Sequence, residues 1–358
     1  MNSEPLLQQN SIFRRLIGNT VLIGLSIFCG LLLAEMYFRL LDPQSIIPRY
    51  VETSSYGIRK NIANVRGMMN VPEYRHIFST NSQGFRGTKE YATEKTSGVY
   101  RIIVLGDSVT LGHGVGDEET FSYILEKQLS LIRPTEVINM GVSGFGTAEE
   151  LIQLRNVGLE YHPDLILLAY FPNDPYNNVV SQLFSVTDGH LNQMQQSFVP
   201  AIYVRDRLYA IPGYSFLCQH SHLVNFIRNR ASGFFIERLA QQNNISSQTS
   251  PSLSAQESEL TALLLNEVIN EARQHQLPLV LLNIPVISKG EVIGNFPIDR
   301  LHVDPSFVHV VDVNNTVYSR YTHDELSYEK DSHPKPFTHQ LIARWLAAFI
   351  EQKIWHSS

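Results

Sequence analysis

The residues best suited to chemistry are a serine, a histidine and an aspartate that lie far apart in the chain. Ser108 follows the hydrophobic run RIIVLG (101–106), whereas Asp331 and His333 stand together near the C-terminal end. A histidine can take the proton of a serine hydroxyl, and an aspartate can hold the imidazole in the required tautomer. These residue types predict attack on an acyl carbonyl, with Ser108 as nucleophile, His333 as general base and Asp331 as its partner.

Two other polar segments contain groups that could stabilise the negative oxygen formed by such an attack. The segment NMGVSGFGT (139–147) contains glycines, which let the backbone approach a ligand closely. Asn173 lies in FPND (171–174), and its side-chain amide could donate to an oxyanion. Ser108 itself can begin a helix, where free N–H groups face a developing negative charge. Each segment alone is more typical of an ordinary turn, and only their occurrence together indicates one site.

Five short hydrophobic runs are predicted to form the strands that position these segments. Their near-continuous apolar character is typical of a parallel sheet that is buried on both faces. Since the carboxyl ends of parallel strands meet at one edge, the polar segments that follow them are expected to converge there. The runs are RIIVLG (101–106), EVINMG (136–141), LILLAYF (165–171), LVLLNIP (279–285) and VHVVDV (308–313).

Helical patterns separate these strands. Thr147 and Glu150 fit a capping box at the start of one predicted helix, and Ser254 and Glu257 fit the same pattern at another. The last helix is expected over 337–353. The alternation predicts the α/β class: a three-layer α/β/α sandwich around a five-stranded parallel sheet, with right-handed crossovers.

The predicted domain organisation follows from where this alternation begins and where it breaks. Residues 98–354 are expected to form the catalytic domain, and the turn-rich residues 35–97 a juxtamembrane connecting segment that lies against it. The alternation breaks at about 176–253, within which a helix is expected near 222–242. This insertion would lie beside the strand ends, where it could form a lid or a wall of the substrate site.

The four polar segments, in this order, resemble the motif blocks of the SGNH/GDSL hydrolases. The blocks match Gly106-Asp107-Ser108, Asn139 to Gly144, Asn173-Asp174 and the Asp331/His333 pair. The resemblance covers roughly residues 81–350 and includes NSQGFRG (81–87), which looks like the membrane-anchored bacterial esterase and acyltransferase members.

The resemblance implies a flavodoxin-like fold and a catalytic triad of Ser108, His333 and Asp331. It also implies an oxyanion hole formed by the backbone N–H groups of Ser108 and Gly144 and by the side chain of Asn173. No cofactor is implied.

Two positions depart from the pattern of this family. Many members space the acid and the base as D-x-x-H, whereas this chain has D-x-H, with Lys330 at the alternative acid position. The shorter spacing resembles that of the alginate O-acetyltransferase relatives. Phe171-Pro172 stands where a glycine is usual, and because proline has no N–H, position 172 supplies no backbone donor.

An uncharged apolar segment near the N-terminus predicts a membrane anchor. LIGNTVLIGLSIFCGLLLA (16–34) is close to the roughly 20 residues that cross a hydrocarbon core. Arg14 and Arg15 precede it, so the positive-inside rule predicts a cytoplasmic N-terminus (1–15) and an extracytoplasmic catalytic domain, on the periplasmic or cell-surface side. The alternatives are a cleaved signal peptide, for which the cleavage site is poor, and a soluble helix, which would be apolar on one stripe only.

The composition excludes several classes of protein. The chain has 358 residues, of which 43% are hydrophobic and 17% charged, as in an ordinary folded protein. Its net charge of -6 gives no support to nucleic-acid binding, which needs a basic face. Cys29 and Cys218 alone cannot build a zinc site, and the histidines show no spacing suited to a metal. We therefore expect no metal or cofactor. His113 lies five residues after Ser108 and could line the pocket, but a histidine of the loop is the simpler interpretation.

These features together predict a serine esterase that hydrolyses acyl esters, with deacetylation of an extracytoplasmic glycan or related ester as the expected reaction. The expected partners are an acylated small molecule or glycan, and the membrane, contacted through residues 16–34. Two alternatives stay open: an O-acyltransferase that acts on an exported polysaccharide, and a non-catalytic glycan-binding or assembly protein with the same fold.

Overall fold

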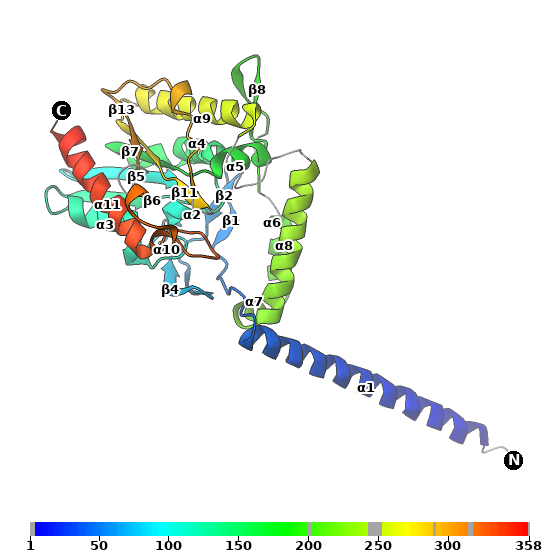
Figure 1. Cartoon of the computed structure of the whole chain (residues 1–358). Coiled ribbons are helices and arrows are strands. Elements are labelled where there is room, and N and C mark those ends of the chain that lie inside the picture. Colours follow the sequence, from blue (N-terminus) through cyan, green and yellow to red (C-terminus); the bar gives the residue numbers. More distant parts are fainter. Residues whose placement is uncertain are drawn as a thin grey trace.

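A five-stranded parallel sheet forms the centre of the computed structural model (Figure 1). The structure describes residues 4–195, 197–199, 202–242, 253–288, 291–313 and 318–356. The sheet has the flavodoxin-like strand order β13-β10-β7-β5-β6. Its strands are β5 (Tyr100–Gly106), β6 (Thr135–Asn139), β7 (Leu165–Tyr170), β10 (Leu279–Asn283) and β13 (Val308–Asp312). Each predicted strand is therefore confirmed to within two residues at either end.

The three central strands, β7, β5 and β10, are buried along their whole length. Successive side chains of a strand point to opposite faces of the sheet. In β5, Ile103 and Leu105 join one hydrophobic cluster, while Ile102 and Val104 join the other. Both faces need apolar residues, which explains why these runs are continuous rather than alternating.

Helices cover both faces of the sheet and make the predicted three-layer sandwich (Figure 1). On the face of Ile103 lie α4 (Thr147–Asn156) and α9 (Ala255–Gln274). On the opposite face lie α3 (Phe121–Leu129) and α11 (Pro336–Phe349), the second of which continues as a π-helical stretch to residue 355. The predicted fold class is confirmed.

One of the two predicted capping boxes is correct and the other is wrong. Ser254 caps α9, and Glu257 reaches back to its N–H, as predicted. At α4 the N-cap is Gly146, whose N–H donates to the carboxylate of Glu149 (3.1 Å). Thr147 already lies inside this helix, so the carboxylate three residues beyond the cap belongs to Glu149 and not to Glu150.

Residues 35–97, expected to be a connecting segment, contain two β-hairpins. β1 (Val51–Thr53) pairs with β2 (Arg59–Asn61), and β3 (Arg66–Val71) pairs with β4 (Tyr74–Ser79). The Asn61 side chain donates to the carbonyl oxygen of Gly141 (2.9 Å), and the Tyr50 hydroxyl bonds the hydroxyl of Ser143 (2.9 Å). This segment thus lies against the loop that follows β6.

The predicted insertion contains a hairpin and several helices, and its residues 243–252 lie outside the described part of the chain. The helix expected near 222–242 is confirmed as α8. The described elements are α5 (Asp174–Ser181), β8 (Phe184–Thr187), β9 (His190–Gln193), α6 (Ile202–Tyr209), α7 (Tyr214–His220) and α8 (His222–Gln242).

The first helix, α1 (Glu4–Leu40), extends away from the sandwich and meets the start of α8 near its own C-terminal end (Figure 1). There Glu35 accepts hydrogen bonds from the backbone N–H groups of His222 (3.0 Å) and Leu223 (2.9 Å). Phe38 stacks on Phe226, with ring centroids 4.3 Å apart. The insertion is therefore tied to the base of α1.

Length and apolar composition make α1 a candidate membrane span. Its stretch from Arg15 to Leu40 contains an apolar window with a mean hydropathy of 2.2, and no residue of that window is buried in the protein. This stretch includes the predicted span 16–34. Of the two cysteines, Cys29 lies in α1 and Cys218 in α7, and both are free.

Several short elements complete the fold. They lie in loops at the ends of the main strands and helices. They are α2 (Ser108–Leu111), α10 (His323–Leu326), β11 (Val286–Ser288), β12 (Glu291–Ile293) and 3-10 turns at Asp117–Glu119, Gly158–Tyr161, Ile298–Arg300 and Tyr318–Arg320.

Arg101 in β5 ties the start of the sheet together. Its side chain is 1% exposed and donates twice to the carboxylate of Glu136 (2.9 and 2.8 Å). It also donates to the carbonyl oxygens of Thr93 (2.9 Å) and Tyr161 (2.7 Å). One buried cation therefore joins two strands and two loops.

We expect Arg101→Ala to lower the free energy of unfolding by about 3–5 kcal/mol, because it leaves a partly buried carboxylate without its partner. The control is Arg155→Ala, which removes ion pairs to Glu267 and Glu271 from a guanidinium that is 33% exposed. Exposed pairs contribute about 0–1 kcal/mol. Urea unfolding of the full chain in detergent, followed by tryptophan fluorescence, measures both, and equal losses would contradict the role given to Arg101.

Candidate active site

A tight turn after β5 presents Ser108 at the edge of the sheet. Gly106 has φ +154°, and a Cβ on it would lie 2.1 Å from Oγ1 of Thr110, so only glycine fits. Asp107 is the N-cap of α2, and its carboxylate accepts a hydrogen bond from the N–H of Val109 (2.8 Å). Ser108 is thereby the first residue of the short helix α2.

The structure brings Ser108, His333 and Asp331 together in one hydrogen-bonded chain. The distance from Nε2 of His333 to Oγ of Ser108 is 2.9 Å, although 225 residues separate them. The other ring nitrogen, Nδ1, is hydrogen-bonded to Oδ1 of Asp331. The side chains of His333 and Asp331 are 23% and 16% exposed, so the chain is reached from solvent. This geometry suits proton transfer from the serine to the histidine.

The short D-x-H spacing is accommodated by an unusual backbone conformation at Ser332. Its φ is +64°, in the left-handed region that non-glycine residues seldom occupy. The N–H of Ser332 donates to the carbonyl oxygen of Tyr328 (3.0 Å), and the N–H of Tyr328 donates to that of His333 (3.0 Å). This tight loop lets Asp331 and His333, two residues apart, point their side chains toward each other.

Two residues from the β3–β4 hairpin hold Asp331 from the other side. The hydroxyl of Tyr74 donates to Oδ2 of Asp331. The carboxylate of Glu73 accepts hydrogen bonds from the N–H groups of Lys330 (3.0 Å) and Asp331 (2.8 Å). Sequence reasoning missed residues 73 and 74, because they lie about 257 residues from Asp331 and carry no motif.

Asp331 remains ionised although it is partly buried. Burial raises the pKa of its carboxyl group, but the hydrogen bond from His333, the charge of His333 and the hydrogen bond from Tyr74 outweigh it and lower the pKa to about 2. Asp331 is thus a carboxylate at any pH at which the protein works. Lys330, at the alternative acid position, has no carboxylate and cannot replace Asp331 in this role.

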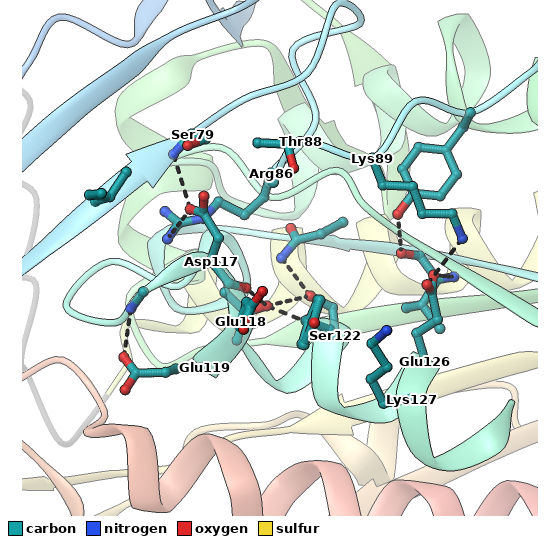
Figure 2. A pocket seen from close by; sticks show the side chains of 18 of the residues that line it. Ser79, Arg86, Thr88, Lys89, Asp117, Glu118, Glu119, Ser122, Glu126 and Lys127 are labelled. Carbon is teal, nitrogen blue, oxygen red and sulfur yellow. Dashed lines mark hydrogen bonds and ion pairs between the residues drawn. The ribbon is translucent and has the colours of Figure 1, made fainter. Parts of the chain in front are cut away.

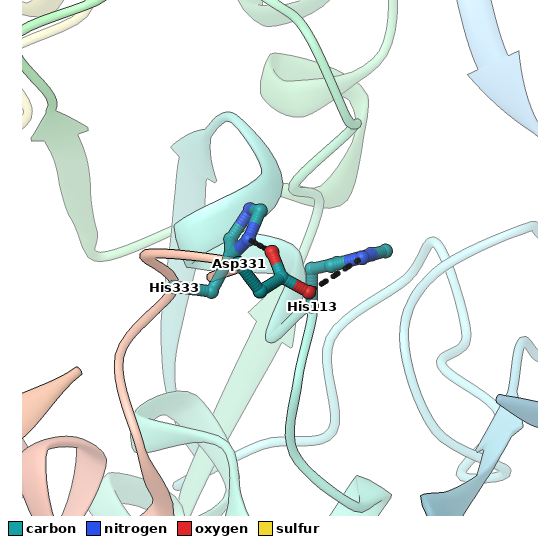
Figure 3. Close-up of side chains that lie close together, drawn as sticks. All are labelled: His113, Asp331 and His333. Atoms are coloured by element: carbon teal, nitrogen blue, oxygen red, sulfur yellow. Dashed lines mark hydrogen bonds and ion pairs between the residues drawn. The ribbon is translucent and has the colours of Figure 1, made fainter. Parts of the chain in front are cut away.

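His113 lies beside this pair, so the alternative that it lines the site is correct and the simpler interpretation as a loop residue is not sufficient (Figure 3). Its Nε2 is 3.9 Å from Oδ2 of Asp331, and its ring centroid is 4.6 Å from that of His333. Its Nδ1 is buried and has no hydrogen-bond partner among the described residues. Burial is the main cause that lowers the pKa of His113, to about 3, so its imidazole is neutral.

The predicted oxyanion donor Gly144 lies in the loop after β6, held by an arginine. Its φ is +77°, and a Cβ on it would lie 2.7 Å from Nη1 of Arg59. The Arg59 guanidinium donates to the carbonyl oxygen of Gly144 and pairs with Glu149 (3.3 Å). The bond from Arg59 holds the carbonyl oxygen of Gly144 in place. The N–H of Gly144 has no acceptor in the described part of the chain.

The other predicted donor, Asn173, is the N-cap of α5 and lies next to the serine turn. Its side-chain nitrogen donates to Oδ2 of Asp107 (3.1 Å). An amide NH2 carries two hydrogens, so one remains for a further acceptor. Asn139 supports the same region, because its side chain donates to the carbonyl oxygen of Thr110 (2.7 Å).

A group of buried acids lies behind the candidate oxyanion loops. Asp107, Glu150 and Asp174 are each at most 1% exposed. Both oxygens of Glu150 and one of Asp174 lack a hydrogen-bond partner among the described residues. Burial first, and the neighbouring carboxylates second, raise the pKa of Glu150 and of Asp174 well above the usual range. Both side chains are therefore neutral where Asp331 is charged.

A cavity of about 580 Å³ lies along the start of α3 (Figure 2). Two ion pairs lie in its wall, with Arg86 3.0 Å from Asp117 and Lys89 3.0 Å from Glu126. None of the three residues of the Ser108 chain lines it. This cavity is therefore separate from the hydrogen-bonded chain of Ser108, His333 and Asp331.

Comparison with known proteins gives a likeness of fold only. No protein-family model and no curated protein sequence matches the chain. Among solved structures, a two-domain esterase active on acetylated mannans is similar at 13% identity and TM-score 0.42, with 73% of this chain and 51% of that chain covered. This chain thus spans about half of the length of that esterase.

Two further solved structures are similar to this chain. A lipase from a goat rumen metagenome has 18% identity and TM-score 0.39, covering 70% of this chain and 96% of that one. A member of the lipolytic protein G-D-S-L family from Veillonella parvula has 12% identity and TM-score 0.38, covering 71% and 99%. In fold and in the order of its motifs, the chain resembles the SGNH/GDSL hydrolases. At these scores the likeness carries no argument about activity, which depends on the geometry of the site.

Glu150→Gln is expected to stabilise the protein increasingly as the pH rises. Because the folded pKa of Glu150 is raised, the unfolded chain loses this proton at lower pH, and the wild type loses stability above about pH 4.5. Glutamine does not titrate, so its advantage grows by at most about 1.4 kcal/mol per pH unit. Thermal unfolding at pH 5, 6.5 and 8 measures it. The exposed Glu118→Gln is the control, and a pH-independent difference for Glu150→Gln would contradict a neutral Glu150.

Proposed function

We propose that this protein is a serine esterase that cleaves acyl esters through Ser108, His333 and Asp331. The single observation that supports the proposal most is the hydrogen-bonded chain from Ser108 to His333 (2.9 Å) and on to Asp331. A carboxylate, an imidazole and a hydroxyl in this order are the parts that activate a serine.

In the proposed reaction, Oγ of Ser108 attacks the ester carbonyl while Nε2 of His333 takes its proton. Nδ1–H of His333 donates to Asp331, which keeps Nε2 free to accept and stabilises the imidazolium that forms. The C–O bond of the ester then breaks, and His333 returns the proton to the leaving alcohol. Water attacks the acyl-enzyme by the same route and releases the acid.

The negative oxygen of the tetrahedral intermediate needs donors that are already in place. We assign this role to the N–H groups of Ser108 and Gly144 and to the second hydrogen of the Asn173 amide. The supporting observations are the hold of Arg59 on the carbonyl oxygen of Gly144 and the bond of Asn173 to Asp107, which fix both donors. Removal of one such donor typically costs about 10²–10³ in turnover.

We further propose that residues 16–34 anchor the protein in a membrane with residues 1–15 in the cytoplasm. Residues 98–354, with the insertion at 176–253, then form an extracytoplasmic catalytic domain. The length and exposure of α1 and the two arginines before its apolar stretch support this topology. In that location, acetyl esters of glycans are the substrates to test first.

Ser108→Ala should abolish ester cleavage while the protein stays folded. The assay follows p-nitrophenyl acetate and an acetylated oligosaccharide, and measures both released acetate and acetyl transfer to added sugar. Ser130→Ala is the control, because its hydroxyl donates to Thr135 away from the chain of Ser108. Removal of the nucleophile should cost at least about 10³ in rate, whereas the control should retain full activity.

The outcome distinguishes the reaction classes. Acetate released only when Ser108 is present supports the esterase, and transfer without release identifies an acyltransferase. A wild type that neither cleaves an ester nor reacts with a fluorophosphonate would overturn both readings and favour a non-catalytic binding protein.

Tyr74→Phe is expected to lower kcat by roughly tenfold with little change in KM. The ring stays in place, but Asp331 loses a donor, and a hydrogen bond to a charged group contributes about 1.5–3 kcal/mol. The matched control is Tyr328→Phe, since the Tyr328 hydroxyl donates to the neutral carbonyl oxygen of Gly114 (3.0 Å). Steady-state kinetics of both variants measure the difference, and a larger loss in Tyr328→Phe would contradict the positioning role of Tyr74.

A further inference from the structure

His113 lies close to Asp331 and His333, and the three side chains together could hold a metal ion (Figure 3). One ligand atom from each of His113, Asp331 and His333 can be chosen so that all lie within 4.8 Å of one another. The sequence did not indicate this group, because 220 residues separate His333 from His113. Two imidazoles and one carboxylate are the ligand set that zinc takes in many open sites.

The spacing and access of these side chains suit an ion. Nε2 of His113 and Oδ2 of Asp331 are 3.9 Å apart, a gap that an ion at roughly 2.0–2.2 Å from each atom can bridge. The side chains of His113, Asp331 and His333 are 11%, 16% and 23% exposed, so an ion can reach them from solvent. A carboxylate oxygen has two lone pairs, so Oδ2 can bind the ion and still accept from Tyr74.

His113 is held in position without any part in the Ser108 chain. Its backbone N–H donates to the carbonyl oxygen of Ser108 (2.9 Å), which fixes it one turn after the serine. Its ring packs at 4.6 Å from His333 and edge-on to Tyr74, at 6.2 Å. One of the three ligands, His113, is thus placed by contacts that the proposed esterase reaction does not use.

We propose that His113, Asp331 and His333 form an inhibitory site for Zn²⁺ or a similar divalent transition-metal ion. The inhibition rests on the esterase proposed above, whereas the binding of the ion does not. Three protein ligands leave a fourth position for water. An ion bound to these side chains therefore blocks the esterase reaction.

The tautomer of His333 explains the inhibition. Nδ1 faces Asp331 and Nε2 faces Ser108, and the proposed esterase reaction requires the proton on Nδ1 and the lone pair on Nε2. When Zn²⁺ binds Nδ1, the proton passes to Nε2, so no proton is gained or lost overall. Nε2 then has no lone pair for the proton of Ser108, and the serine cannot be activated.

Zinc binding is tested first on the full chain carrying Ser108→Ala, in detergent, by calorimetric titration with Zn²⁺ alone. This background retains all three ligands and needs no catalytic activity. We expect one saturable site whose affinity falls at least tenfold when His113→Asn is added, because one of three ligands is lost. The control is His162→Asn, which removes an exposed histidine that also lies 3.9 Å from a carboxylate, that of Glu94, but without a third ligand.

Inhibition is tested next in protein with Ser108 intact. Zn²⁺ should slow both ester cleavage and the labelling of Ser108 by a fluorophosphonate, and EDTA should restore them. Each rate is divided by that variant's own rate without zinc. The zinc concentration that halves this normalised rate should be at least tenfold higher for His113→Asn than for wild type, and unchanged for His162→Asn. His113→Gln serves as the second variant, and circular dichroism verifies that each is folded.

The two proposals fail in different ways. Zinc binding that depends on His113 in a protein that cleaves no ester would refute the esterase and leave the metal site standing. Absence of saturable binding, or binding and inhibition that are unchanged in folded His113→Asn and His113→Gln, would overturn the zinc site. If zinc binds through His113 but does not slow the labelling of Ser108 by the fluorophosphonate, the proposed inhibition by zinc is wrong.

Discussion

The carboxylate of Asp331 is the point on which the geometry of the candidate site depends. One of its oxygens is bonded to His333 and the other to Tyr74, while its backbone N–H is bonded to Glu73. A D-x-H pair leaves only one residue in which to turn the two side chains together, and Ser332 does so with φ +64°. Such a conformation persists only where its surroundings hold it. The hairpin that carries Glu73 and Tyr74 supplies that hold, so residues 35–97 are a structural part of the site.

The sheet could be predicted because the burial of each strand shows in a few consecutive residues of the sequence. A strand buried on both faces needs an unbroken apolar run, and β5, β7 and β10 each show one. Once the strands are parallel, their carboxyl ends lie on one edge, which brings the segments of Ser108 and Asn173 together. The site residues that lie at strand ends were therefore accessible to sequence reasoning, and their proposed roles stay open to experiment.

Tyr74 and Glu73 could not be found in this way, and His113 could be named only as a residue that could line the pocket. Their contacts depend on how a hairpin and a loop dock on a domain, and no period or motif in the sequence records that docking. The same limit explains the wrongly predicted cap of α4. Glu149 and Glu150 are adjacent, and the sequence alone does not show which of the two carboxylates lies three residues after the N-cap. Only the helix start at Thr147 decides that Glu149 lies at the capping position and Glu150 in the interior.

Carboxyl groups of two kinds within one region show how environment decides charge. Asp331 has donors in His333 and Tyr74, and these outweigh the cost of burial, so it stays ionised. Glu150 and Asp174 are fully buried with few or no donors, so burial keeps them neutral. The difference matters for the proposed chemistry. Two more negative charges behind the donors of Gly144 and Asn173 would oppose the charge that develops on the oxyanion, whereas neutral acids leave the donors to act on it unopposed.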